Sequence, residues 1–225
     1  MAGTEDPLDG RVGYPVISAV ALRPLPRRVL RRRAREPEEI PVGVGSVLVA
    51  QFHDTYEAVP RRAGLTDRRL VEATALLLVS TQQRLVEASV VMPSADQQTG
   101  IEIRARFRCR VADPVALLDS GVHDIGPALT EYLLGYARVR MVCISMSLRD
   151  RYAWYQLQQR VVAMLLAYGE VVPVPVLGLS ATLADVAVRA LAVESGGLRV
   201  HPPAPAYGGV GDEYRDNNYT WGSQP

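Results

Sequence analysis

The sequence predicts an α+β fold in which an antiparallel sheet packs against helices, and three observations support this. One segment before residue 112, IEIRARFRCRV, alternates apolar and charged residues with a period of two, which is typical of a half-buried strand, and other segments before it also predict strands. A polar, turn-forming stretch joins two of these segments as a hairpin. Between residues 124 and 168, apolar residues recur at helical spacing.

The composition limits the chemistry that the chain can perform. Its 225 residues are enough for one core of roughly 150 residues with two tails. All 25 basic residues are arginines, which excludes mechanisms that need a catalytic or phosphate-binding lysine. The net charge of +1 conceals an uneven distribution, because residues 11–35 hold eight arginines and no carboxylate.

The cysteines and the hydropathy pattern indicate where the protein works. Cys109 and Cys143 lie among apolar residues, so we expect free buried thiols in a reducing compartment. The acidic N-terminus lacks the apolar run of a signal peptide. No stretch reaches the roughly 18 apolar residues that cross a bilayer. We therefore expect a cytoplasmic protein that is at most peripheral on the inner face of the cell membrane.

The N-terminal part of the chain predicts a basic arm followed by two strand pairs. Residues 1–37 are expected to form a flexible arm, because four prolines prevent a long helix and RRVLRRRAR is a solvated basic run. Residues 40–60 predict two strands, IPVGVGSVLVAQF and HDTYEAVP, and a turn follows at 63–67. Residues 70–92 predict two more, ATALLLVST and RLVEASVVM. PSADQQTG at 93–100 then predicts a hairpin connection.

The clearest strand is IEIRARFRCRV, residues 101–111, whose two faces differ in chemistry. Its apolar face holds Ile101, Ile103, Ala105, Phe107, Cys109 and Val111, and its charged face holds Glu102, Arg104, Arg106, Arg108 and Arg110. The first face is expected to be buried and the second to face outward. Asp113-Pro114 ends the strand and turns the chain, and an apolar stretch follows.

Two helices are expected next. Asp124 as N-cap with Pro127 in the first turn predicts the start of one helix. Its apolar stripe comprises Leu129, Leu133, Tyr136 and Ala137. A second amphipathic helix is predicted from about Leu148 to Tyr168, with Gly169 as its C-cap and Tyr152 and Tyr155 facing outward.

The C-terminal part is less regular. VVPVPVLGLS has strand character, and its two prolines suggest an edge. Residues 181–194 could be helix or strand, because alanine favours one and valine the other. Residues 195–225 are rich in Gly, Pro, Asn and Tyr and are expected to be a disordered tail.

The order of these elements resembles the SPFH family, also called band 7 or PHB, which includes stomatin, prohibitin, flotillin and the bacterial HflK and HflC proteins. The matching pieces are PVGVG at 41–45, SAD at 94–96, VADP at 111–114 and GVHD at 121–124. The resemblance implies an SPFH-like domain over residues 38–194. Family members usually carry an N-terminal membrane segment and a C-terminal coiled coil, where this chain has its basic arm and short tail.

The resemblance implies a non-enzymatic, membrane-associated scaffold that organises proteins or lipids by forming homo-oligomers. It brings no catalytic residue, cofactor or metal. The alternative is a soluble assembly or adaptor protein that uses the same domain without touching lipid. A hydrolase is disfavoured, because GLSAT at 178–182 lacks the second glycine of a nucleophile elbow.

Two arginine groups are candidate binding residues. The first could bind anionic lipid headgroups and comprises Arg27, Arg28, Arg31, Arg32, Arg33 and Arg35. Nucleic acid is the less favoured ligand, since Val16–Leu22 adds apolar groups that suit a membrane interface, and a solvated arm without function stays open. The second group, Arg104, Arg106, Arg108 and Arg110, is either a solvated face paired with carboxylates such as Glu87 or a self-association surface.

The remaining polar and aromatic residues give weaker signals. His53, His123 and His201 are widely separated, so neither a metal site nor a catalytic pair is expected. Four tail aromatics are either part of a linker or anchors for a protein partner. They are Tyr207, Tyr214, Tyr219 and Trp221.

Overall fold

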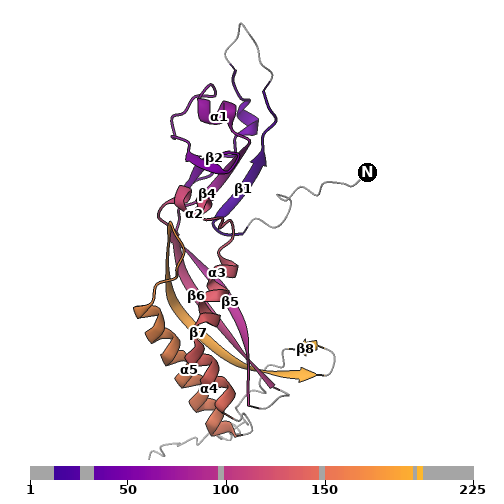
Figure 1. Cartoon of the computed structure of the whole chain (residues 1–225), viewed down its shortest axis with the longest axis vertical. Coiled ribbons are helices and arrows are strands. Elements are labelled where there is room, and N and C mark those ends of the chain that lie inside the picture. Colours follow the sequence, from indigo (N-terminus) through magenta and orange to yellow (C-terminus); the bar gives the residue numbers. More distant parts are fainter. Residues whose placement is uncertain (1–12, 26–32, 96–98, 147–149, 195–196, 200–225) are drawn as a thin grey trace, which may run out of the picture.

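The computed structural model describes residues 13–25, 33–95, 99–146, 150–194 and 197–199, the side chains as far as Leu191. Its strands form two four-stranded antiparallel sheets that lie one above the other in an elongated body (Figure 1). The first sheet, ordered β1-β4-β2-β3, contains β1 (Val16–Ala21), β2 (Ser46–Phe52), β3 (Thr55–Ala58) and β4 (Ala75–Ser80). The second, ordered β5-β6-β7-β8, contains β5 (Arg84–Pro93), β6 (Thr99–Val111), β7 (Leu179–Glu194) and β8 (Gly197–Arg199).

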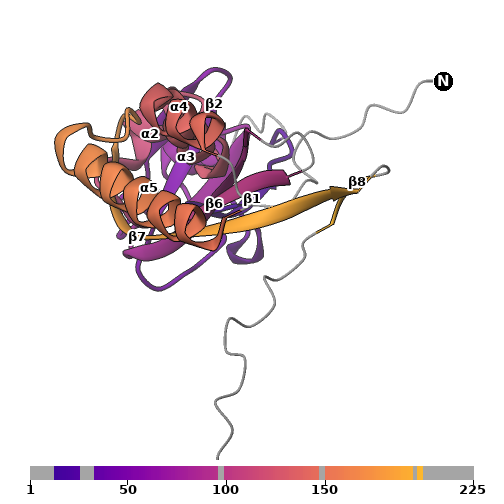
Figure 2. The ribbon, with the colours of Figure 1, turned by 90° about the horizontal axis from the view of Figure 1, so that it is seen from below.

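Helices complete the α+β architecture, which confirms the predicted class, although two sheets replace the single expected sheet. The helical elements are η1 (Pro37–Glu39), α1 (Arg68–Glu72), α2 (Pro114–Asp119), α3 (Gly126–Gly135), α4 (Ala137–Ser145) and α5 (Arg151–Val171). The last three cover one face of the second sheet (Figures 1 and 2). Within the described ranges, no helix has the length and apolarity to cross a membrane.

The predicted flexible arm over 1–37 is wrong where the structure describes it, because β1 belongs to the first sheet. β1 pairs with β4, and Val16 and Leu22 are buried. The Tyr14 hydroxyl donates to the backbone oxygens of Gln82 and Cys109, which holds the start of β1 against the second sheet. Pro15 and Pro24 lie just before and just after β1, so they do not prevent it from forming a strand.

The strands predicted between residues 40 and 111 are confirmed except at the start of the first, because β2 begins only at Ser46 and residues 40–45 form a loop. β4 is buried along its whole length, since it lies inside the first sheet with both faces covered. In β6, Ile101, Phe107 and the other apolar-face residues are buried, and Phe107 meets the ring of Tyr132 edge-on at 5.9 Å. The charged face is largely exposed, except that Glu102 is buried.

The region left open at 181–194 is a strand. β7 pairs with β6 along the whole length of β6. Val186 and Val188 are buried in the second core, which lies between the second sheet and the helices α3, α4 and α5.

The strand expected at VVPVPV is wrong, because β7 begins only at Leu179, after the prolines. β7 pairs with β6 on one side and with β8 only at Ala192–Glu194 on the other, so most of that other side has no strand partner among the described residues. The tail prediction is also wrong at Gly197–Arg199, which form β8. Residues 195–196 and 200–225 lie outside the described residues.

The helices near 124 and 148–168 are confirmed, with corrected ends. The N-cap of α3 is Ile125 and not Asp124, whose carboxylate instead accepts a hydrogen bond from the Gly126 amide. α3 ends at Gly135, so Tyr136 and Ala137 of the predicted stripe lie beyond it.

Leu157, Val161 and Leu165 bury one face of α5, as the spacing predicts. Gly169 does not cap α5, which continues to Val171. A Cβ at Gly169 would lie 2.9 Å from Leu183 Cβ, so glycine is needed here for close packing on β7.

Three short helices, α1, α2 and α4, do not follow from the sequence pattern. α2 occupies the apolar stretch after Asp113, whose carboxylate accepts hydrogen bonds from the amides of Val115 and Ala116 at 3.0 and 3.1 Å. Leu117 and Leu118 of α2 are buried in a cluster that joins the two sheets. This junction cluster also contains Val16, Val49, Leu77, Val79 and Val111.

Candidate functional site

Arg35, predicted to bind lipid, is instead a buried structural residue. Its side chain is 1% exposed, and its guanidinium donates to the backbone oxygens of Arg23, Leu70 and Ala73 at 2.6, 2.9 and 3.4 Å. Glu39 adds a carboxylate 3.8 Å away. Arg35 thus ties the end of β1 to the α1 region and cannot reach a headgroup, which corrects its assignment.

The other arginines of this group remain candidates. Arg33 is exposed, and so is Arg23, which precedes the predicted group. Arg27, Arg28, Arg31 and Arg32 lie outside the described residues. The Arg35 guanidinium donates to the Arg23 carbonyl, so Arg35 lies beside the end of β1.

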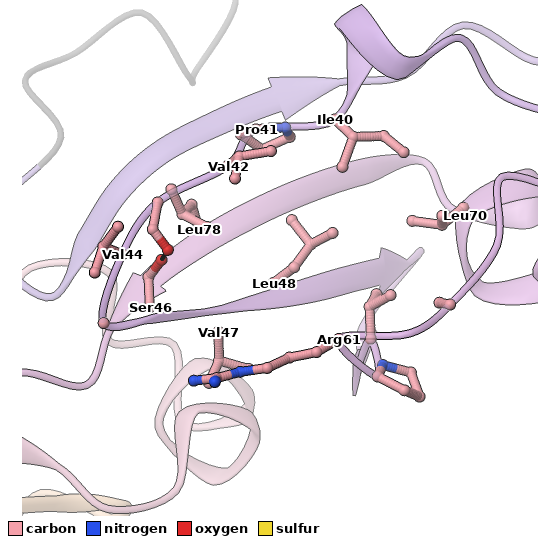
Figure 3. Close-up of a pocket in the computed structure, with 15 residues that line it drawn as sticks. Ile40, Pro41, Val42, Val44, Ser46, Val47, Leu48, Arg61, Leu70 and Leu78 are labelled. Carbon is pink, nitrogen blue, oxygen red and sulfur yellow. Dashed lines mark hydrogen bonds between the residues drawn. The ribbon is translucent and has the colours of Figure 1, made fainter.

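An apolar groove of about 420 Å³ lies on the face of the first sheet that points away from the junction cluster (Figure 3). Leu48 and Leu78 form its floor on β2 and β4, and Leu70 of α1 lies at one end. The segment from Ile40 to Gly45 runs along one side, and Arg61 contributes a cation to the lining. The groove is therefore an apolar hollow with a basic residue at its border.

Two valines beside this groove are almost fully exposed, Val42 at 91% and Val44 at 95%. The loop that carries them has a defined geometry. The Ser46 hydroxyl donates to the Gly43 carbonyl at 2.6 Å, and the Thr81 amide donates to the Gly45 carbonyl at 3.0 Å. Gly45 has φ of +69°, which glycine adopts without strain. The fold thus holds two apolar side chains in solvent.

Arg104, Arg106, Arg108 and Arg110, which we call the arginine stripe, follow the open face of the second sheet. Arg104 Nε lies 2.9 Å from Glu102, and this carboxylate raises the pKa of Arg104. Arg106 pairs with Asp185. Glu87, the expected partner, lies opposite Arg106 in the strand register. Two of the four arginines are therefore already neutralised within the chain.

The first turns of α5 carry exposed aromatic side chains. Tyr152 and Tyr155 on α5 are exposed, as the spacing predicts. Tyr155 borders a second groove of about 380 Å³. Its other lining residues are Met146, Gln156, Gln159 and Arg160. The surface is therefore amphipathic and suits contact with another protein.

The cysteines and histidines do not gather into a reactive centre in the described part of the chain. Cys109 and Cys143 are free and buried, as expected, and burial raises the pKa of each thiol to about 11. The ring of His123 contacts Tyr56, and His53 lies in the turn between β2 and β3. No group of three metal-binding side chains is present among the described residues.

The groove and its exposed valines were not predicted from the sequence, although the PVGVG segment could have indicated exposed valines. Valines that alternate with glycines outside a regular strand have no neighbouring side chain to cover them. The tail aromatics at 207, 214, 219 and 221, and His201, lie outside the described residues. No family model matches this chain, and no curated protein matches it either.

Proposed function

We propose that this chain is a non-enzymatic scaffold of the SPFH or band 7 type. It binds the surface of an anionic membrane from the cytoplasmic side and organises proteins or lipids by forming homo-oligomers. The observation that carries the membrane part of the proposal is the pair of exposed valines, Val42 and Val44, beside an apolar groove.

The surroundings of these valines suit a membrane interface. Exposing two branched apolar side chains to water is unfavourable, and burying them among acyl chains would recover this free energy. Arg61 lines the same groove, and Arg62 is exposed next to it. Each guanidinium near an anionic surface contributes about 1 kcal/mol. Apolar insertion and electrostatic attraction would therefore act together.

The resemblance to the SPFH family supports the same proposal from the sequence. PVGVG, one of the segments that carry the resemblance, is the loop that holds Val42 and Val44. The arginines at 27, 28, 31, 32 and 33 would add to the attraction. Arg35 is left out of this set because of its structural role.

Vesicle sedimentation tests the membrane contact. Val42→Ser combined with Val44→Ser should weaken binding to phosphatidylglycerol-containing vesicles by roughly tenfold or more, since two apolar side chains no longer insert. Met141→Ser with Ile144→Ser is the matched control, because these residues are exposed on α4, away from the groove. If both variants bind like the unmodified chain, the valines are not the membrane contact.

The electrostatic part is tested separately. Glutamine at the five positions 27, 28, 31, 32 and 33 should weaken sedimentation with anionic vesicles, and added salt should have the same effect. Equal binding to pure phosphatidylcholine vesicles would reject the electrostatic mechanism.

A soluble adaptor is the second candidate, favoured by Tyr152 and Tyr155 beside the second groove. Exposed tyrosines are effective anchors in protein interfaces. If the unmodified chain binds neither anionic nor neutral vesicles, the adaptor function replaces the membrane scaffold. Serine at both tyrosines should then reduce the mass of complexes pulled down with the chain.

A further inference from the structure

The outer strands of the two sheets differ in how well they are protected from pairing with another chain. β3 has four residues and β8 has three, and β1 has an irregular register between Val16 and Ser18. Short or irregular edge strands are poor templates for a further strand. β7 also has a side without a strand partner within the described ranges, from Leu179 to Leu191, but its pairing with β6 is irregular where Asp185 and Leu183 meet Arg106 and Phe107. β5, by contrast, has ten residues and pairs with β6 in one uninterrupted register.

The free side of β5 is neither short nor irregular, and α3 and α4 contact this strand from the helical layer. Among the described residues, β6 is the only strand that pairs with β5. Leu85 and Val91 are 61% and 45% exposed on its open face, and Glu87 is the charged residue between them. Unpaired backbone groups beside exposed apolar side chains are the typical features of a strand that accepts another.

We propose that β5 pairs antiparallel with β5 of a second copy of this chain, about a two-fold axis at Ala88. This inference rests on the homo-oligomer of the proposed function, and it identifies the β5 edge as the contact between the copies. In this register, Leu85 of each copy lies opposite Val91 of the other, and Glu87 lies opposite Ser89. Each exposed apolar residue then has an apolar partner on the other copy. Because the interface is two-fold, the Leu85–Val91 pair occurs twice.

Neighbouring registers are less favourable. Moving the axis to Glu87 places the two Glu87 carboxylates opposite each other, which is destabilising. Moving it to Ser89 places Glu87 opposite Val91 and Leu85 opposite Pro93. A shift of the axis by half a residue would place outward side chains opposite inward ones. The sequence of β5 therefore selects Ala88.

The arginine stripe supports this register through charge. Ser89 pairs with Arg104 in the β5–β6 register, and Glu87 pairs with Arg106. In the dimer, Glu87 lies between its own Arg106 and Arg104 of the other copy. The two glutamates therefore separate the arginine stripes of the two copies at the seam.

Sedimentation equilibrium in lipid-free buffer tests the contact. Leu85→Lys with Val91→Lys places lysines opposite each other and should weaken self-association by about tenfold or more. Thr182→Lys with Ala187→Lys adds the same charge to exposed positions of β7 and should associate like the unmodified chain. Unchanged association of the β5 variant would overturn the proposal.

Cysteine cross-linking tests the register in a protein that keeps the apolar contact. Glu87→Cys with Ser89→Cys should form a disulfide-linked dimer under mild oxidation, while each single variant links much more slowly. The native thiols are buried and should not compete. Fast linking of the Glu87→Cys variant alone would overturn the axis at Ala88.

Vesicle sedimentation separates this proposal from the proposed function. If the unmodified chain binds anionic vesicles but the cysteine pair does not link with or without them, the β5 contact is wrong and membrane binding stands. If the pair links but the chain binds no vesicle, the β5 contact stands and the membrane function is wrong.

Discussion

Arg35 shows how one buried guanidinium can fix the path of a chain. Its three backbone acceptors come from Arg23, Leu70 and Ala73, which lie in two separate parts of the sequence. Arginine suits this position because its planar fork presents several donors and keeps its charge. The cost of burying the charge is offset by these acceptors and by Glu39.

Removing this side chain should destabilise the first sheet. We expect Arg35→Ala to lower the free energy of unfolding by about 2–4 kcal/mol, because three backbone carbonyls, two of them in buried hydrogen bonds, lose a donor. Urea denaturation measures the change. Arg33→Ala, at an exposed position, should stay within about 0.5 kcal/mol of the unmodified chain. Equal effects of the two variants would contradict the structural role of Arg35.

The two thiols are a second feature at the residue scale. Cys109 and Cys143 are fully buried in the second core. Burial favours the neutral thiol and raises the pKa from an ordinary value of 9.0 to about 11 in each case. A thiol whose pKa is higher in the folded state than in the unfolded state contributes stability that is fully present below the unfolded pKa. This contribution to the free energy of unfolding is lost as the pH rises through the folded pKa.

The melting temperature should therefore fall between about pH 9 and pH 11, as the unfolded chain loses thiol protons first. Thermal melts followed by circular dichroism measure this fall. The double variant Cys109→Ala and Cys143→Ala should show a shallower fall, which does not vanish because burial also raises the pKa of Tyr132 to about 12. An identical slope in both proteins would exclude the thiols as its cause.

At the scale of elements, the start of β7 is tied to the start of α2. Gly178 has φ of +72°, and its carbonyl accepts hydrogen bonds from the amides of Ala112 and Asp113 at 2.8 and 3.0 Å. A Cβ at this position would lie 2.2 Å from the Asp113 backbone oxygen. The turn after β6 and the entry to β7 thus share one backbone contact that only glycine permits.

Gly178→Ala should consequently lower the free energy of unfolding by at least about 2 kcal/mol, through the left-handed backbone and the clash with Asp113. Gly64→Ala is the control, because a Cβ there meets no atom within 4 Å. That change should be neutral or slightly stabilising. Denaturant titration compares the two, and a neutral Gly178→Ala would contradict this account.

At the scale of the whole molecule, the junction cluster makes the two sheets parts of one elongated body (Figure 1). Leu117 and Leu118 of α2 share this cluster with residues of β1, β2 and β4 in the first sheet and with Val111 at the end of β6 in the second. The groove valines and the β5 edge therefore keep a fixed relation to each other. In the proposed assembly, membrane binding would raise the local concentration of β5 edges and so favour pairing.

The local sequence pattern was enough to predict the strands between residues 46 and 111, the helix around Leu157 and the buried face of β6. β6 and α5 are periodic and each buries one apolar face, and β4 is a continuous apolar run buried on both faces, so the local pattern carries the information. The outward positions of Tyr152 and Tyr155 followed from the same spacing. The strand choice at 181–194 did not, since its local pattern fits either structure.

The remaining features depend on residues that are distant in the sequence and meet only in the folded chain. β7 is a strand because it pairs with β6 in an antiparallel ladder, and β1 is a strand because it pairs with β4 in the same way. Arg35 looks like a member of a solvated basic run until Leu70 and Ala73 supply its acceptors. Val42 and Val44 are exposed because the fold leaves nothing to cover them among the described residues. Local propensity cannot encode a partner that lies tens of residues away.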